Sequence, residues 1–202
     1  MMKTILMSSV FVMLFGGNIA AQNPKSLSLS SEFSTFVVAG FEPMDTAMGD
    51  LNGDGRADCL LALRKINEVE LSTPDNLEKS GEQPRPLLIL LRQADGTWKL
   101  GARNDAAVDC YVCGGTMGDP YQRMAIKNGY FTVETSGGSR WMWSRYLTFK
   151  FVKAENRWVF HRMDESSFDR ANPNAAKEKK SSRKARGKKK IYFENYAESQ
   201  LE

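Results

Sequence analysis

Short apolar runs separated by turn-forming dipeptides are the main pattern of the chain after residue 58. Residues 59–63 are continuously apolar, which is typical of a buried strand. Residues 87–91 and 97–100 flank Asp95-Gly96, a dipeptide that supplies the positive φ angles of a tight hairpin turn. The pattern therefore predicts an antiparallel hairpin at this point.

A second hairpin and a long strand follow. Residues 123–127 and 130–135 flank Asn128-Gly129, which predicts another antiparallel turn. From residue 140 to 152 apolar residues alternate with polar ones, so one face of a long strand is expected to be buried. The residues on that face are Trp141, Trp143, Leu147, Phe149 and Phe151. Residues 157–163 are expected to return as the partner strand.

Helical patterns are weak and occur only at residues 66–71 and 75–79. The predicted fold class is therefore mainly β. Antiparallel hairpins and a meander are expected to form a twisted sheet or sandwich with little helix.

Hydropathy and charge divide the 202 residues into four segments. Residues 1–21 have one charge, an apolar run and small residues at the end, the order of a secretory signal peptide. The apolar run is too short for a transmembrane segment, so a periplasmic or secreted protein without one is expected. Residues 22–170 form the predicted β-rich domain.

The remaining two segments are basic and then apolar. Residues 171–190 hold nine Lys or Arg and one Glu but no large apolar residue, which predicts a flexible linker. Its charge is either that of a solvated tether or a means of contacting anionic envelope surfaces. Nucleic acid is an unlikely partner for an exported chain. Residues 191–202 are expected to dock back on the domain, with 191–196 as an edge strand.

The clearest chemical pattern starts at Asp50. Oxygen-bearing side chains stand at loop positions 1, 3, 5 and 9, as Asp50, Asn52, Asp54 and Asp58, and the main-chain carbonyl of Arg56 stands at position 7. Calcium takes about six to eight oxygen ligands, so this spacing predicts a Ca²⁺ site. The alternative is a polar turn that holds no ion.

The pattern D-x-N-x-D-G-x-x-D ahead of an apolar strand resembles the calcium loops of FG-GAP and VCBS repeats, as found in integrin-type propeller blades. The resemblance implies a bound calcium ion and covers about fifteen residues. This chain has the loop once and shows no repeat of blade length. Leu61 stands where a helix-loop-helix EF-hand has its bidentate Glu, so that form is not expected.

Several motifs in order also resemble a family of uncharacterised secreted proteins of Gram-negative bacteria. Besides the loop they are Arg-Pro-Leu-Leu-Ile-Leu-Leu-Arg from residue 85, Cys-x-x-Cys-Gly-Gly from 110, Asn-Gly-Tyr-Phe from 128 and Gly-Gly-Ser-Arg-Trp from 137. This resemblance implies an envelope or extracellular setting. It transfers no activity and no catalytic residue.

Cys110 and Cys113 are three residues apart, and in an exported chain a disulfide is the plain interpretation. A zinc site would need two more ligands, and Cys59 and His161 are the only thiol and imidazole left; a redox-active pair is the third alternative. Cys59 itself lies in an apolar run and is interpreted as a small buried hydrophobe.

Enzymatic chemistry has few candidate residues. His161 is the single histidine, and no Gly-x-Ser-x-Gly nucleophile motif accompanies it. Because Trp158 and Phe160 lie close to it on the same predicted strand, a partly buried structural residue is expected. Trp141, Trp143 and Trp158 form either part of the core or a platform for a sugar or peptide. The favoured function is a calcium-stabilised binding or interaction module with a protein or glycan ligand. The alternative is a calcium-dependent or His161-dependent hydrolase.

Overall fold

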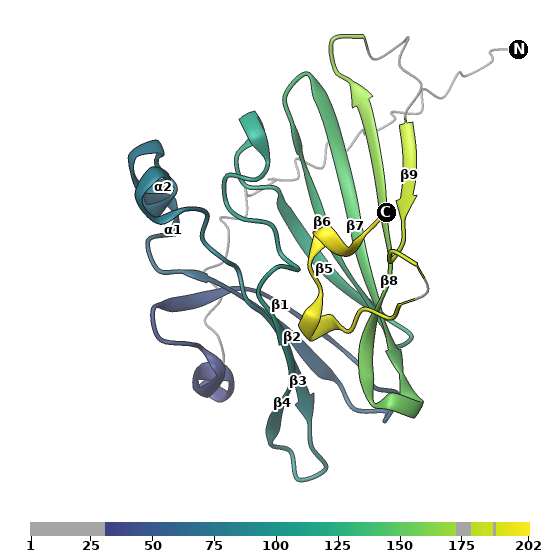
Figure 1. The fold of residues 1–202 in the computed structure, drawn as a ribbon. Helices are drawn as coiled ribbons and strands as arrows, with labels where there is room; N and C mark the ends of the chain where they lie inside the picture. Colours follow the sequence, from purple (N-terminus) through teal and green to yellow (C-terminus); the bar gives the residue numbers. More distant parts are fainter. Residues whose placement is uncertain (1–30, 173–178, 188) are drawn as a thin grey trace, which may run out of the picture.

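The computed structural model describes residues 31–172, 179–187 and 189–202 (Figure 1). The predicted signal peptide, residues 1–21, lies outside the described residues, as does part of the predicted basic linker. Within the described part of the chain, no helix has the length and apolar character needed to cross a membrane.

Two antiparallel sheets make up the fold, which confirms the predicted mainly β class. The first sheet contains β1 (Phe41–Gly49), β2 (Asp58–Lys65), β3 (Leu87–Arg92) and β4 (Trp98–Asn104) in that order. The second contains β5 (Tyr121–Lys127), β6 (Tyr130–Gly138), β7 (Trp141–Val152), β8 (Arg157–Asp169) and β9 (Lys179–Arg183). Each sheet is a meander, because every strand pairs with its neighbours in sequence.

Among the described residues, helix is confined to short pieces that join or cover strands. The α-helices are α1 (Glu68–Leu71) and α2 (Pro74–Ser80), close to the predicted helical stretches. The 3-10 helices are Ser31–Phe36, Gly115–Met117, Lys153–Glu155, Phe193–Asn195 and Glu198–Gln200. Both predicted hairpins are present, and Asn128 and Gly129 take φ angles of 52° and 73° at the β5–β6 turn.

The continuous apolar runs of β2 and β3 are explained by burial on both faces of the first sheet. Leu60 and Ile89 face the core between the sheets. Leu61 and Leu88 belong to a second cluster on the opposite face, to which Phe33 of the 3-10 helix Ser31–Phe36 also belongs. A strand covered on both sides has no solvent face and therefore no need for polar residues.

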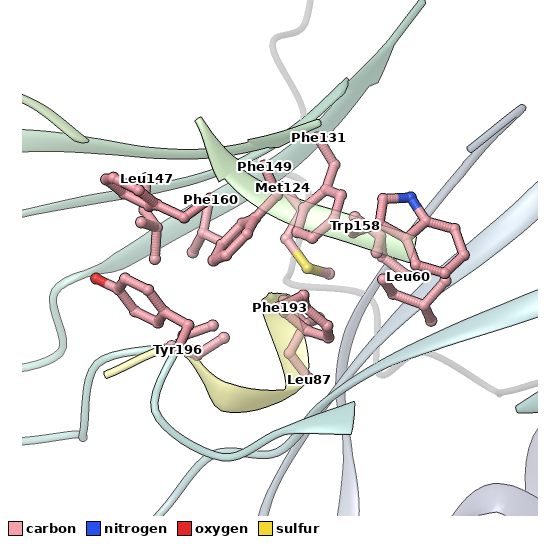
Figure 2. Packing of buried hydrophobic residues seen from close by; sticks show 14 of the residues in the cluster. Leu60, Leu87, Met124, Phe131, Leu147, Phe149, Trp158, Phe160, Phe193 and Tyr196 are labelled. Carbon is pink, nitrogen blue, oxygen red and sulfur yellow. The ribbon is translucent and has the colours of Figure 1, made fainter. Parts of the chain in front are cut away.

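The main core lies between the two sheets and is rich in aromatic side chains (Figure 2). Phe149 is fully buried and contacts Phe131, Phe160, Phe193 and Tyr196, with ring centroids 5.0 to 6.2 Å apart. These rings come from β6, β7, β8 and the end of the chain. The second sheet and the C-terminal segment therefore share one packed interior.

The C-terminal segment, residues 191–202, packs into this core, but it does not form the predicted edge strand. Phe193 is fully buried within a 3-10 helix, and Tyr196 and Leu201 are also buried. The side-chain amide of Asn104 in β4 donates hydrogen bonds to the carbonyls of Phe193 (2.7 Å) and Tyr196 (3.0 Å). The tight turn lets closely spaced aromatic residues face the same core, which an extended strand would send to opposite sides.

Strand β9 lies within the segment that was predicted to be a flexible linker. It pairs with β8 from Met163↔Arg183 to Ser167↔Lys179. Pairing at a sheet edge uses main-chain hydrogen bonds, so it needs no large apolar side chain. Composition alone therefore gave the wrong structure for residues 179–183, while residues 173–178 and 188 lie outside the described residues.

The buried stripe of β7 is shorter than predicted. Leu147 and Phe149 are buried, but Trp143 is only partly buried and Trp141 is 50% exposed. Trp141 pairs with Asp169 at the far end of β8. Apolar and polar residues still alternate toward Trp141, but the core does not extend far enough to cover this end of the strand.

Replacing Phe193 with Ala should lower the free energy of unfolding by about 3–5 kcal/mol, because it leaves a cavity among the core rings. Phe168→Ala is the matched control, since Phe168 is 42% exposed and should change stability by less than about 0.5 kcal/mol. Urea unfolding of both variants measures the difference. Equal losses would contradict the docking of the C-terminal segment.

Candidate functional site

The predicted calcium loop forms the connection between β1 and β2. Gly53 and Gly55 adopt φ angles of 75° and 81°, which residues with a side chain rarely take. These two positions let the chain curl tightly between Asp50 and Asp58. The loop is thus fixed at both ends by strands of the first sheet.

Asp50 organises the first half of the loop. Its Oδ1 accepts hydrogen bonds from the main-chain N–H groups of Asn52 (3.2 Å), Gly53 (2.7 Å) and Asp54 (3.3 Å). Its Oδ2 accepts one from Gly55 (2.9 Å). Desolvation alone would raise the pKa of Asp50, but these four N–H groups together lower it. The carboxylate is therefore kept ionised by the loop that surrounds it.

Asn52 and Asp54 face each other. The amide nitrogen of Asn52 donates to Asp54 Oδ2 (2.9 Å), and Asn52 Oδ1 accepts from the main-chain N–H of Asp54 (3.0 Å). The guanidinium of Arg56 also forms an ion pair with Asp54 Oδ2. A protein cation therefore already lies against one of the predicted metal ligands.

Asp58 has a different role from the other loop residues. It is fully buried, and its two oxygens accept hydrogen bonds from the main-chain N–H groups of Leu51 (2.9 Å) and Arg92 (3.0 Å). Burial raises the pKa of Asp58 despite these two bonds. The carboxylate thus ties the start of the loop and the end of β3 to β2.

The loop fits a calcium ion in its donor chemistry. Asp50, Asn52 and Asp54 place carboxylate and amide side chains on one short turn, and the Arg56 carbonyl stands at the next ligand position. Both Asp58 oxygens already accept main-chain hydrogen bonds, and position 9 of calcium loops often acts through a water molecule. Oxygens of Asp50 and Asn52 accept main-chain hydrogen bonds as well, so the loop has the donor types of a calcium site while these oxygens are engaged with its own main chain.

The Cys110 and Cys113 sulfurs lie 2.23 Å apart, which confirms the predicted pair as a disulfide. It borders a cavity of about 320 Å³ that is also lined by Glu82, Asp109 and Glu198. Among the described residues, only Glu82, Cys110 and Cys113 form a cluster of three cysteine, histidine or acidic side chains close enough to share an ion. Glu82 was not predicted, because it reaches the pair from 28 residues earlier in the sequence.

Cys59 and His161 do not join that pair. Cys59 is fully buried on β2, and burial raises the pKa of its thiol to about 12. His161 is exposed on β8, where its ring contacts Tyr130 edge-on at 5.3 Å. Cys59 and His161 therefore do not supply the two additional ligands that a zinc site at Cys110 and Cys113 would need.

The surroundings of His161 are those of a surface residue. Partial desolvation and the positive charges of Arg162 and Lys150 lower its pKa. His161 lines none of the main cavities found among the described residues. The expectation that it is partly buried was wrong.

The tryptophan residues divide between core and surface. Trp158 is buried, and its Nε1 donates to the carbonyl of Leu51 (3.2 Å), so it belongs to the core. Lys179 lies over the ring of Trp141 at 5.3 Å, and Arg145 lies over the ring of Trp143 at 5.2 Å. The two exposed or partly exposed rings therefore carry basic neighbours.

A buried ion network near the disulfide was not predicted. Arg85 is fully buried and pairs bidentately with Glu68 (2.7 and 2.8 Å) and with Asp119 (both 2.7 Å). Its Nη1 also donates to the carbonyl of Asp109 (3.2 Å). The only sequence signal is an arginine between two prolines ahead of a buried strand, which does not identify its partners.

Comparison of the chain with protein-family models, curated proteins and solved structures gave no match. The resemblance of the loop to FG-GAP and VCBS repeats therefore depends on its own residues.

Asp58→Ala should lower the free energy of unfolding by about 2–4 kcal/mol in the presence of a calcium chelator, because two buried N–H groups lose their acceptor. Asp95→Ala is the control, since Asp95 also accepts two hydrogen bonds, both from Thr97, but at an exposed turn. Its loss should stay below about 1 kcal/mol. If denaturant unfolding gives similar values for both, Asp58 is not a structural tie.

Thiol titration of protein prepared in an oxidising compartment should find no reactive thiol in the native state and one, Cys59, after unfolding. Reduction of the unfolded chain should reveal three. Three thiols before reduction would contradict the disulfide, and a rapidly reactive thiol in the native state would contradict the burial of Cys59.

Proposed function

We propose that this protein is an exported, calcium-stabilised binding or interaction module of the periplasm or cell exterior, with a protein or glycan ligand. The observation that carries the proposal is the loop between β1 and β2. It carries the side chains of Asp50, Asn52 and Asp54 on one turn, and Asp58 ties that turn to the first sheet. Outside the cytoplasm calcium reaches concentrations that fill even weak sites.

In this proposal calcium has a structural role. Asp50 and Asp54 carry negative charges within five residues, and one neutralising cation in the loop is Arg56. A divalent ion would neutralise both carboxylates and hold the β1–β2 connection in one conformation. Stability would then depend on calcium through mass action.

The proposed ligand surface lies on the parts of the sheets that the core does not cover. Trp141 and Trp143 lie on one face of β7, with Lys179 and Arg145 against their rings. Aromatic rings beside cations and hydrogen-bonding groups are suited to sugars and peptides. This arrangement supports a binding module.

The hydrolase alternative has less support. A hydrolytic site needs a base within hydrogen-bond reach of a nucleophile or a water, inside a cleft. His161 instead lies on an exposed strand face beside Tyr130, Arg162 and Lys150. We therefore prefer the binding module to a His161-dependent enzyme.

The basic segment forms a second part of the proposal. Lys179 and Lys180 lie exposed on edge strand β9, and Lys184 follows them. We infer that this edge contacts anionic envelope surfaces by long-range attraction, which salt would screen. In the same region Arg183 and Lys190 pair with Glu198 and Glu155.

Adding calcium at about 10 to 100 times the dissociation constant should stabilise the protein by about 1.4–2.7 kcal/mol relative to chelator. Thermal melting measures this as a rise in the midpoint. Asp50→Asn should abolish the rise, whereas Asp95→Asn, a turn residue of the β3–β4 hairpin, should keep it. Identical midpoints with calcium and chelator in the unaltered protein would leave only the turn without an ion.

A further inference from the structure

A groove lies directly beside the candidate calcium loop. It has a volume of about 560 Å³, is open to solvent, and is bordered by the loop, the β3–β4 hairpin and the 3-10 helix Ser31–Phe36. The side chains that matter for its chemistry are Glu32, Arg56, Arg92 and Trp98. Two guanidinium groups thus face one groove.

Arg92 is held in place by neighbours within the groove. Its Nη1 pairs with Glu32 at 3.2 Å, and its guanidinium lies over the ring of Trp98 at 4.7 Å. Trp98 Nε1 donates to the same Glu32 oxygen at 3.0 Å. This arrangement orients Arg92 while Glu32 neutralises part of its charge.

Arg56 connects the groove to the loop. Its Nε donates to the main-chain carbonyl of Arg92 at 2.9 Å, while its Nη2 pairs with Asp54 Oδ2. The same Asp54 oxygen accepts a hydrogen bond from Asn52. One end of the guanidinium is therefore fixed beside Arg92, and the other is occupied by a carboxylate that calcium would also need.

Calcium and Arg56 compete for one carboxylate in this geometry. A carboxylate that ligates a divalent cation has less negative charge to offer a guanidinium, and the two cations repel each other. The Nε bond to the Arg92 carbonyl does not involve Asp54, so it can hold the side chain beside the groove after the exchange. Two forks that suit bidentate binding of oxyanions would then lie together.

We propose that the groove is an oxyanion-binding site in which the Arg56–Asp54 ion pair weakens anion binding, and that calcium strengthens anion binding by taking the Asp54 carboxylate. This inference rests on the proposed calcium function of the loop. The ligand chemistry is a sulfate, phosphate or carboxylate group, either free or carried on a sugar. Because coupling between two binding sites is reciprocal, the anion also strengthens calcium binding.

The experiment measures calcium and anion binding by calorimetry in the full chain and in four variants. The anion probes are inorganic sulfate and a sulfated disaccharide, with the unsulfated disaccharide as the neutral probe. In the unaltered protein, calcium should tighten sulfate binding about two- to fivefold, the range expected for an exposed ion pair. Stronger binding of the sulfated disaccharide than of sulfate identifies a sugar-borne group, and the reverse identifies a free anion.

Asp54→Asn tests the release of Arg56 from its ion pair in the absence of calcium. It should bind sulfate in chelator about as tightly as the unaltered protein does in calcium, because Arg56 has lost its charged partner. Arg56→Gln should bind calcium about two- to fivefold more tightly and lose the calcium dependence of sulfate binding. Arg92→Gln should weaken sulfate binding without changing calcium affinity. Arg64→Gln, an exposed arginine paired with Glu42 away from the groove, should behave as the unaltered protein.

The outcomes separate this inference from the calcium proposal. If the unaltered protein binds no calcium but Asp54→Asn still gains sulfate affinity in chelator, the calcium proposal fails. The claim that the Arg56–Asp54 ion pair weakens anion binding in the groove is then still supported. If calcium binds but Asp54→Asn gains no sulfate affinity, and sulfate binding by Arg56→Gln still depends on calcium, the inference about the groove is overturned. Equal changes in Arg64→Gln would also overturn it, since they would reflect net charge alone.

Discussion

The buried carboxylate of Asp58 holds together the parts of the molecule on which the proposed function depends. One oxygen binds the N–H of Leu51 at the start of the loop, and the other binds the N–H of Arg92 at the end of β3. The carbonyl of Leu51 accepts from the core residue Trp158, and the carbonyl of Arg92 accepts from Arg56. Loop, groove and core therefore share this one connection. A buried carboxylate is costly, and its two main-chain donors are what make the position tolerable.

Local patterns in the sequence predicted most of the strands. The hairpins at Asp95-Gly96 and Asn128-Gly129 depend on residues next to each other in the chain, and both are present. The run at residues 59–63 was predicted to be buried from its continuous apolar composition, which is also a local property, and it is buried. Errors arose where the partner of a segment decided its structure. Strand β9 follows from the free edge of β8, and the turn at Phe193 follows from the shape of the core it fills.

The candidate site was only partly predictable for a similar reason. The spacing of Asp50, Asn52 and Asp54 is a local property, and the structure places these side chains on one turn. The contact between Arg56 and Arg92 spans 36 residues, and that between Trp98 and Glu32 spans 66. No periodicity or motif encodes such contacts. The groove and the network of Arg85 with Glu68 and Asp119 can therefore be identified only from the three-dimensional structure.

The packing of the C-terminal segment has a consequence for the order in which the molecule forms. A chain is synthesised from its N-terminus, yet Phe193, Tyr196 and Leu201 complete a core that includes buried residues of β2, β3 and β5 to β8. Until residues 191–202 have been made, the aromatic side chains that they cover have no partner from this segment, and such transiently exposed apolar surface favours aggregation. Residues 191–202 therefore complete the main core only after the strands that surround them have been made.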